Sequence, residues 1–450
     1  MSFVCFVVKI PSVPDIPKTM RAVVYRGPND LRLETVPVPR IGPNELLVKV
    51  AVCGVCPTDI KKIQYGTVPP PRIFGHETAG VISKLGSGVS KLGWKIGDRV
   101  ALHHHVPCLD CHFCRHHAFA QCETYKRTGI TAGFEPAGGG YAEYVRVLPF
   151  VLPGVVKIPA KNSFAEGALL EPVNTVLKAV RRLSLLRGDV VLVAGQGPIG
   201  LMFTRLLQLA GAQVIATDLL APRLRLARKF GAKWTVNAMK SSAGVTPASA
   251  NQPLQPGRLR YNKRPALNSQ LSTLIHRATR GRGLDAAVIA VPSDAAVQQA
   301  LQLIRCGGQV LLFAHTKRSA PSSLSAACGG EGRGEVVQNS TLNPTARRSG
   351  AKAAQPPVLR SLGEGGSTLN FPLNLASVCL DEKDLLGSYS SDFTLQDEVA
   401  RLVFSRQLDV RLLITHRFPL EQTAAAVQLA SRPTEDSLKI IVGGTACRRP

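Results

Sequence analysis

A glycine-rich turn between an apolar strand and a helix constrains the fold of this chain most strongly. The apolar run at residues 189–194 is followed directly by Gly-Gln-Gly-Pro-Ile-Gly, and helical periodicity begins within that motif. Glycines at these spacings allow a tight turn and let backbone amides at a helix N-terminus approach a pyrophosphate closely. The pattern G-x-G-x-x-G is weak alone, but in this strand–turn–helix context it predicts a dinucleotide-binding α/β unit.

The rest of the second half repeats this alternation of strand and helix. Such alternation predicts a doubly wound parallel sheet with crossover helices, the Rossmann architecture. The segments that alternate are 199–209, 213–217, 222–230, 284–290, 295–304 and 309–313. The chain then closes with a predicted helix at 395–405, a strand at 410–415, a helix at 420–430 and a strand at 438–442. Short strands separated by Gly, Pro and Asp fill residues 20–146, which predicts a separate small β-barrel or sandwich.

The cofactor candidates lie around the glycine turn. Asp218 ends the next predicted strand, where a carboxylate can accept hydrogen bonds from both ribose hydroxyls of NAD and repel a 2′-phosphate. Arg223 lies nearby and keeps NADP open as the second choice. We therefore expect NAD to bind at Asp218 and at the turn, whose predicted contact residues are Gly195, Gly197, Pro198, Ile199 and Gly200.

Four cysteines within fifteen residues form a second local motif, C-x2-C-x2-C-x7-C. Four thiolates on one loop suit a tetrahedral zinc site, and because such a site keeps no open position it is predicted to be structural. Disulfides are the alternative, but they do not suit a long chain with 11 cysteines and no convincing secretory signal. The predicted ligands are Cys108, Cys111, Cys114 and Cys122.

A second metal site is suggested by scattered residues of the first half. Cys56 stands in Cys-Pro-Thr-Asp after a predicted strand, and His76 stands in Gly-His-Glu before another. Glu77 or Asp59 could bind a metal directly or orient its ligands, and Glu171 offers a further carboxylate at the junction of the two halves. Three protein ligands and an open position would form a Lewis-acid site for an alcohol or carbonyl. No spacing rule links these positions, and on chemistry alone a lone histidine such as His76 is more often a structural or surface residue than a metal ligand.

These motifs, in this order, resemble the zinc-dependent medium-chain dehydrogenases/reductases of the alcohol, sorbitol and threonine dehydrogenase type. The matching elements are Cys-Pro-Thr-Asp at 56–59, Gly-His-Glu-Thr-Ala-Gly at 75–80 with Gly86 and Val89, the four cysteines, Glu-Pro at 171–172 and the glycine turn. The resemblance covers most of the chain. It implies an α/β protein with a GroES-like β-barrel catalytic domain at 20–175, completed by 392–450, and an NAD-binding Rossmann domain at 176–391.

The resemblance also implies roles for single residues. Cys56 and His76 resemble two catalytic zinc ligands, and relatives take the third from the position of either Glu77 or Glu171. The implied activity is reversible NAD-linked oxidation of a secondary alcohol, polyol or threonine-like hydroxyl to a carbonyl, in a homodimer or homotetramer with one catalytic and one structural zinc per subunit.

Neighbouring residues are assigned supporting roles. Thr58 resembles the hydroxyl that receives the substrate proton, whereas Lys61 stands where many relatives continue this relay through a histidine. Cys53 matches no ligand position and is expected in the core. Six histidines are predicted on loop surface near the four cysteines and the cleft, namely His103, His104, His105, His112, His116 and His117.

The net charge of +25 raises nucleic-acid binding as an alternative. About ten of these charges lie in segments 1–19, 239–268 and 317–370, which lack steady periodicity and are predicted to be disordered. No basic motif with interleaved aromatic residues is present, so nucleic acid is not the expected partner. A catalytically silent NAD- and zinc-binding sensor is the other alternative, because Lys61 and the insertions could remove activity.

The irregular segments also bear on domain length. Without 1–19, 239–268 and 317–370 the chain has 347 residues, an ordinary length for the family it resembles. We therefore predict two insertions at loops of the nucleotide sheet and an N-terminal extension before Met20. No apolar run approaches the ~20 residues of a membrane helix, and a cytoplasmic location is expected.

Overall fold

The computed structural model describes residues 16–103, 105–128, 138–238, 269–314 and 375–443. The predicted insertions 239–268 and 317–370 and nearly all of the extension 1–19 lie outside these residues. The first strand begins at Thr19, one residue inside the predicted extension. No helix of the described part is long and apolar enough to cross a membrane.

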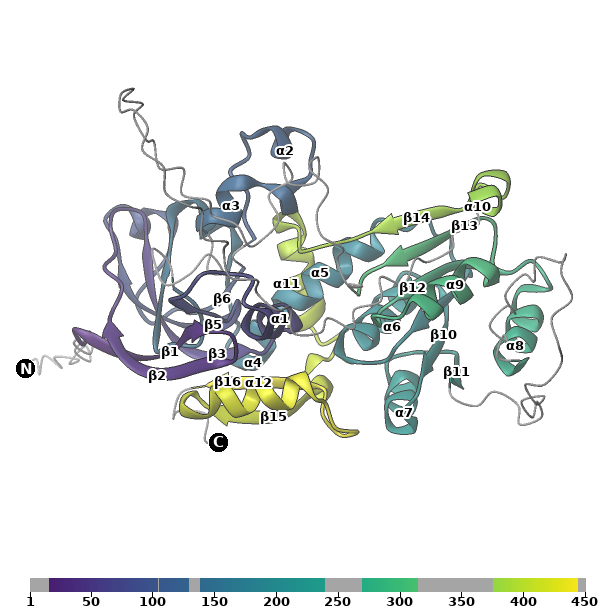
Figure 1. Ribbon diagram of the computed structural model, residues 1–450. Helices are drawn as coiled ribbons and strands as arrows, with labels where there is room; N and C mark the ends of the chain where they lie inside the picture. Colours follow the sequence, from purple (N-terminus) through teal and green to yellow (C-terminus); the bar gives the residue numbers. More distant parts are fainter. Residues whose placement is uncertain (1–15, 104, 129–137, 239–268, 315–374, 444–450) are drawn as a thin grey trace, which may run out of the picture.

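Six parallel strands form one open sheet in the second half of the chain (Figure 1). Its order is β11-β10-β9-β12-β13-β14, the doubly wound order of dinucleotide-binding domains, so the predicted Rossmann sheet is confirmed. The strands are β9 (Val190–Ala194), β10 (Gln213–Asp218), β11 (Trp234–Asn237), β12 (Leu284–Ile289), β13 (Ile304–Leu312) and β14 (Asp384–Gly387).

Helices cover both faces of this sheet because its central strand is apolar on both sides. Val191 and Val193 of β9 pack in one buried cluster, and Val190 and Leu192 pack in another on the opposite face. The first cluster includes side chains of α5 and α6, and the second those of α8 and α9. The helices of this half are α5 (Leu170–Val180), α6 (Pro198–Leu209), α7 (Ala221–Lys229), α8 (Ser269–Thr279), α9 (Asp294–Leu303) and α10 (Leu375–Leu380).

The first half forms a mainly antiparallel β-structure that the end of the chain completes. Its larger sheet has the order β15-β16-β3-β5-β6-β8, with β7 also on β3, and the smaller has the order β2-β1-β4. The strands are β1 (Thr19–Gly27), β2 (Asp30–Pro37), β3 (Leu46–Gly54), β4 (Arg72–Ile73), β5 (Glu77–Leu85), β6 (Arg99–Leu102), β7 (Tyr144–Val147), β8 (Val155–Lys157), β15 (Ile414–Pro419) and β16 (Lys439–Gly443). β16 pairs with β3, which places the last strand beside the first half of the chain.

Short helices flank these sheets, and α5 and α11 lie between the two halves (Figure 1). They are α1 (Pro57–Tyr65), α2 (His112–Arg115), α3 (Glu123–Thr128), α4 (Phe164–Ala168), α11 (Gln396–Phe404) and α12 (Thr423–Ser431). The predicted strand at 410–415 is wrong at its start, since Val410–Leu413 is a 3-10 turn and β15 begins at Ile414. The side chain of Asp409 accepts a hydrogen bond from the Arg411 backbone N–H and favours this turn over an extended chain.

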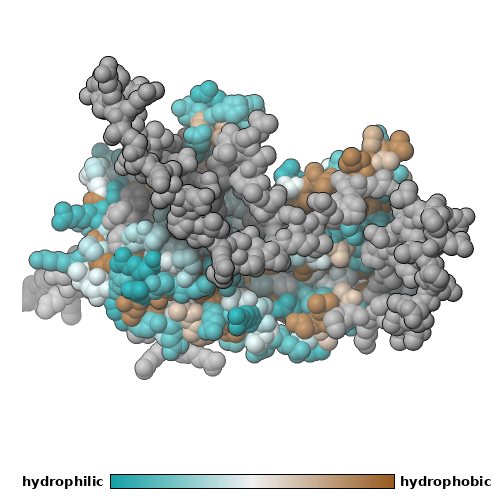
Figure 2. Space-filling model, viewed as in Figure 1, coloured by the Kyte–Doolittle hydropathy of each residue, from teal (hydrophilic) through white to brown (hydrophobic). Residues whose placement is uncertain are grey.

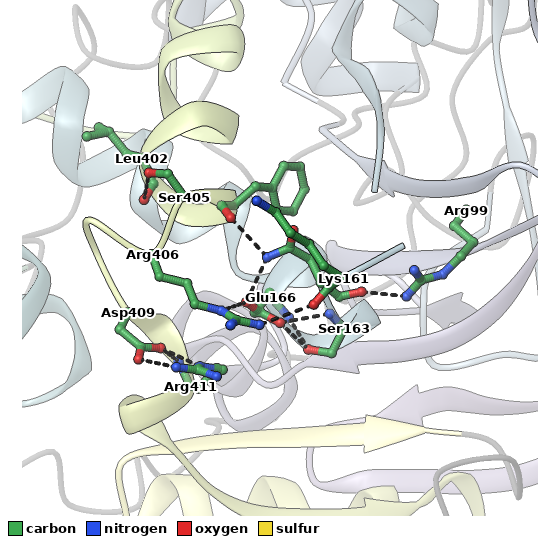
Figure 3. Close-up of polar contacts among 11 residues, drawn as sticks. Arg99, Lys161, Ser163, Glu166, Leu402, Ser405, Arg406, Asp409 and Arg411 are labelled. Carbon is green, nitrogen blue, oxygen red and sulfur yellow. Dashed lines mark hydrogen bonds and ion pairs between the residues drawn. The ribbon is translucent and has the colours of Figure 1, made fainter. Parts of the chain in front are cut away.

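A buried carboxylate ties the C-terminal part of the chain to α4 (Figure 3). Glu166, 2% exposed, forms a capping box with Ser163 at the start of α4. Its Oε1 accepts hydrogen bonds from Asn162 Nδ2 at 2.9 Å and Arg406 Nε at 3.1 Å, and the same Asn162 amide donates to the Phe404 carbonyl at 3.2 Å. Burial opposes ionisation, but the Ser163 backbone N–H, which donates to Oε2 at 2.7 Å, outweighs it together with these side-chain donors and lowers the pKa of Glu166.

Replacement Glu166→Gln should lower the free energy of unfolding by about 2 kcal/mol at pH 7, because charge-assisted hydrogen bonds are lost. The folded-state pKa lies below the usual 4.5, so the stabilisation is complete above pH 4.5 and is lost as the pH falls through the folded-state value. Urea denaturation of the intact chain and of Glu166→Gln should therefore show a difference in the free energy of unfolding at pH 7, and this difference should narrow below pH 4.5.

The exposed pair Asp409–Arg411 in the same region supplies the control. Arg411→Ala should lower the free energy of unfolding by less than about 1 kcal/mol. An equal loss in both variants would mean that Glu166 has no special part in joining the C-terminal segment to α4.

Candidate active site

Three predicted metal ligands converge at the ends of β3 and β5. Cys56 immediately precedes α1, His76 immediately precedes β5, and Glu77 is the first residue of β5. Glu77 lies opposite Gly54 in the antiparallel pairing of β5 with β3, and Gly54 is two residues before Cys56 in the chain. The ligand atoms of these three side chains therefore lie within 4.8 Å of one another, in a sulfur, nitrogen and oxygen set that suits zinc.

The Glu77 carboxylate is buried, and only one of its two oxygens accepts a hydrogen bond from the described residues. Lys439 Nζ, from β16, donates to Oε1 at 2.5 Å and to the Val55 carbonyl at 2.9 Å. Among the described residues no group hydrogen-bonds to Oε2. Burial lowers the pKa of Lys439, but the Glu77 carboxylate more than offsets this effect and the pKa is raised. Oε1 is thus held by a cation, and Oε2 remains for a metal.

Sequence reasoning missed Lys439. The only signal is a charged residue at the start of an apolar strand, and nothing in the sequence shows which carboxylate it meets.

Asp59 orients the His76 ring. Asp59 is fully buried in the first turn of α1, and its Oδ1 lies 3.1 Å from His76 Nδ1. Burial lowers the pKa of His76, but the negative charges of Asp59 and Cys56 outweigh it and raise the pKa well above its ordinary value. A carboxylate on Nδ1 leaves Nε2 for a metal, the arrangement common around metal-binding histidines.

Glu171 lies near this group but outside it. It occupies the first turn of α5, and its Oε1 is 3.3 Å from His105 Nδ1. The His105 ring lies 6.2 Å from the ring of His76. Burial raises the pKa of Glu171 to about 7. The structure therefore brings Glu171 to the same site as a neighbour of His105.

Two of the six histidines predicted on loop surface are buried, so that prediction is wrong for His103 and His105. Burial lowers the pKa of His103 to about 3, and its Nε2 lies 3.3 Å from Ser391 Oγ. Both histidines follow β6, and side chains from later segments contact them, Ser391 at His103 and Tyr125 at His105. The prediction of exposure is confirmed for His112, His116 and His117, and His104 lies outside the described residues.

Thr58 and Lys61 lie one turn apart on α1, just after Cys56, so they share one face of the helix. Thr58 is half-buried and Lys61 is exposed, so that face runs from the metal ligands toward solvent. Cys53 is fully buried, as predicted, and burial raises the pKa of its thiol to about 12.

The glycine turn has the geometry that a dinucleotide requires. Gly195 adopts a φ of +93°, and a Cβ at Gly200 would lie 1.8 Å from the Gly195 carbonyl oxygen. Gly197 is the N-cap of α6 and provides no side chain to cap it, and Pro198 and Ile199, both half-buried, form the first turn. The N-terminal amides of α6 are thus available to a phosphate group.

Asp218 lies at the end of β10 beside this turn. Its two carboxylate oxygens accept hydrogen bonds from the backbone N–H groups of Gln196 at 2.6 Å and Leu220 at 2.9 Å, which fix the carboxylate. Arg223 turns away toward the C-terminal segment, where its Nη2 donates to the Ser437 carbonyl at 3.5 Å.

The four predicted structural ligands also converge, with sulfur atoms within 4.8 Å of one another. The Cys108 backbone N–H donates to Cys122 Sγ at 3.3 Å and so closes the loop on itself. A hydrogen bond from the Asp110 backbone lowers the pKa of Cys108 to about 6, whereas burial raises the pKa of Cys114 to about 12. We call Cys108–Thr128 the lobe. Its four sulfurs suit a closed zinc site.

Comparisons with known proteins agree with this architecture. The sequence profile of the alcohol dehydrogenase GroES-like domain matches residues 42–160. The chain is 27% identical to sorbitol dehydrogenase of Bacillus subtilis (strain 168) over 433 residues, which cover 95% of this chain and 98% of the relative. It is 35% identical to sorbitol dehydrogenase of Macaca fascicularis over 238 residues, 50% of this chain and 62% of the relative.

A solved structure shows the same fold at low identity. Acetophenone reductase from Geotrichum candidum NBRC 4597, in complex with NAD, superimposes with a TM-score of 0.66 at 19% identity. The match covers 96% of this chain and 100% of that protein.

Gly54 provides a direct test of the Glu77 geometry. A Cβ at Gly54 would lie 1.9 Å from Glu77 Oε2, while its backbone is not in the left-handed region that requires glycine. Gly54→Ala should therefore displace the carboxylate and weaken zinc binding at Cys56, His76 and Glu77 by about tenfold or more. Competition titration with a chelator measures this affinity.

Gly27→Ala is the matched control, because no atom lies within 4 Å of a Cβ at that position of β1. Zinc in the lobe should be retained in both variants. Unchanged zinc affinity at the Cys56 site in Gly54→Ala would remove Glu77 Oε2 from the ligand set.

Proposed function

Since this chain belongs to the zinc-dependent medium-chain dehydrogenases/reductases, we propose that it catalyses the reversible NAD-linked oxidation of an alcohol to a carbonyl compound. The substrate class is a secondary alcohol, a polyol or a threonine-like hydroxyl. The observation that carries this proposal is the convergence of Cys56, His76 and Glu77 in a chain whose other half holds the dinucleotide turn. The sequence similarity to sorbitol dehydrogenases supports a polyol.

We assign the catalytic zinc to Cys56, His76 and Glu77. Glu77 is preferred to Glu171 because a Glu77 carboxylate oxygen lies within 4.8 Å of the Cys56 and His76 ligand atoms and its buried Oε2 has no donor among the described residues, whereas Glu171 faces His105. Zinc, when bound, supplies a Lewis acid that lowers the pKa of the substrate hydroxyl, and bound NAD supplies the hydride acceptor.

The chain's own residues orient a metal ligand and transfer the substrate proton. Asp59 holds the His76 ring. Thr58 accepts the substrate proton as it gives up its own hydroxyl proton. Lys61, one turn along α1, takes up that proton as a neutral amine and releases it to solvent, in place of the relay histidine of many relatives. His103 is neutral when buried and keeps charge out of this part of the site.

The cofactor is assigned to the glycine turn and Asp218. The N-terminus of α6, formed by Gly197, Pro198 and Ile199, would hold the pyrophosphate, and Gly195 and Gly200 would permit its approach. The fixed Asp218 carboxylate would accept hydrogen bonds from the ribose hydroxyls and would repel the extra phosphate of NADP. Arg223 faces Ser437, which argues against a role in binding that phosphate.

The domain division is proposed as residues 20–175 with 392–450 for catalysis and 176–391 for the cofactor. The pairing of β16 with β3 supports the C-terminal completion. The dehydrogenase relatives do not favour a silent sensor or a nucleic-acid-binding protein.

We also propose that the chain forms a homodimer or homotetramer through the edge of the nucleotide sheet. β14 is the edge strand of that sheet in the described residues, and α10 lies beside it. Figure 2 shows apolar side chains gathered over α10, where Leu375 and Leu380 are 69% and 81% exposed, and Leu385 of β14 is 42% exposed. An apolar edge of this kind favours association with a second copy.

The activity is tested by zinc analysis and by NAD reduction with sorbitol, butanediol, threonine and simple alcohols. The intact protein should hold two zincs and oxidise at least one of these substrates faster with NAD than with NADP. Cys56→Ala should hold one zinc and lose about a hundredfold or more in kcat/KM. Cys306→Ala, at an exposed cysteine of β13, should behave as the intact protein. Two zincs with no turnover of any substrate would instead identify a sensor.

The association surface is tested by Leu380→Lys, which places a charge in the apolar patch. Analytical ultracentrifugation should show a smaller assembly than for the intact protein, because a buried unpaired charge opposes the interface. Leu186→Lys, at a leucine 76% exposed elsewhere on the nucleotide domain, should leave the assembly unchanged. The same mass for both variants would exclude this edge as the interface.

A further inference from the structure

Residues 388–393 follow β14 at the edge of the sheet where the cofactor is expected. The register places Ala194, Ile289, Leu312 and Gly387 level with one another at the carboxyl ends of β9, β12, β13 and β14. Dinucleotides bind outside this edge of a doubly wound sheet. Asp218 lies on the β10 side of the glycine turn, so segment 388–393 lies on the opposite side, toward the nicotinamide end.

The lobe touches this segment at two points. The ring of Phe119 lies 5.5 Å from that of Phe393 at an interplanar angle of 72°. Tyr125 Oη lies 3.5 Å from Ser390 Oγ. Phe119 and Tyr125 pack in one small cluster with the cysteines of the lobe, and Tyr125 is 3% exposed.

The lobe and segment 388–393 each touch the predicted reactive site as well. The Tyr125 ring lies 5.0 Å from the ring of His105, whose Nδ1 lies 3.3 Å from Glu171 Oε1. Ser391 Oγ lies 3.3 Å from Nε2 of the buried His103. The lobe therefore reaches both the histidine pair and the segment from the nucleotide sheet that covers it.

We propose that the lobe is a clamp for the cofactor side of the site, with Tyr125 and Phe119 as positioning residues. When its four cysteines hold zinc, the lobe keeps segment 388–393 against His103 and His105, and this arrangement binds the nicotinamide cofactor more tightly. The proposal rests on the proposed function for its cofactor, but the contact between lobe and segment is independent of any reaction.

Contacts with α5 limit how far segment 388–393 can loosen when the lobe contacts are lost. Lys178 Nζ donates to the Tyr389 carbonyl at 2.9 Å, and the Asp392 backbone N–H donates to Asn174 Oδ1 at 2.8 Å. Both partners lie on α5, so the backbone of the segment has a second anchor. Loss of the lobe contacts should loosen the segment without unfolding the sheet.

The experiment compares the intact chain with Cys108→Ser and Phe393→Leu. Zinc content, NADH affinity by fluorescence titration and hydrogen exchange of residues 388–393 are measured for each. Cys108→Ser should lose one of two zincs, and Phe393→Leu should keep both. Both variants should weaken NADH binding by about fivefold or more and speed exchange in the segment, and the double variant should be no worse than either single one.

Phe150→Leu is the matched control, because Phe150 is a half-buried ring that packs on the same apolar cluster as Phe393, outside the lobe. It should change neither NADH affinity nor exchange of 388–393. If Cys108→Ser fails to fold, Phe393→Leu and Tyr125→Phe still decide the matter, since each removes one contact and spares the cysteines.

Two results would overturn the proposal. One is loss of the lobe zinc with unchanged exchange in 388–393. The other is unchanged exchange in Phe393→Leu. Failure of the intact chain to bind NADH would count against the proposed function instead, and the exchange measurements would still test the clamp.

Discussion

A buried carboxylate that needs two cations organises the reactive half of this molecule. An isolated charge is costly in the interior, so Glu77 requires partners that the surrounding chain must supply. Lys439 satisfies one oxygen, and it comes from a strand 362 residues away in sequence. The site is therefore complete only when β16 is paired with β3, which makes the C-terminal strand part of the metal centre.

The same constraint explains small residues nearby. Gly54 has no side chain where the Glu77 carboxylate lies, and the pairing of β3 with β5 sets these two residues opposite each other. The backbone conformation of Gly54 is one that other residues can adopt. Glycine is required there because any side chain would collide with the closely packed Glu77 carboxylate. The register of β3 with β5 thus sets both where the Glu77 carboxylate lies and why position 54 must be glycine.

Features formed by neighbours in sequence could be predicted, and those formed by distant segments could not. The glycine turn and the four cysteines each lie within a short stretch, so their spacing, with the strand and helix that flank the turn, predicts their geometry. Alternating strands and helices likewise predicted the parallel sheet. Spacing carries no information about Lys439 beside Glu77, Glu171 beside His105, or Ser391 beside His103, because each pair joins segments far apart in sequence. The burial of His103 and His105 depends on the same long-range contacts, which is why they were expected on the surface.

The charges of the site favour a bound divalent cation over a site that works without one. Asp59, Glu77 and Glu171 are buried carboxyl groups, and the half-buried Cys56 thiol lies beside them, against the positive charges of Lys439 and a protonated His76. The rise in the pKa of Glu171 to about 7 follows first from burial, and the charge of Glu77 adds to it. Among the described residues, Asp59 Oδ2 and Glu77 Oε2 have no hydrogen-bond donor. A cation held by the Cys56, His76 and Glu77 ligands would offset this excess of negative charge at the place where it is greatest, and protein groups alone do not.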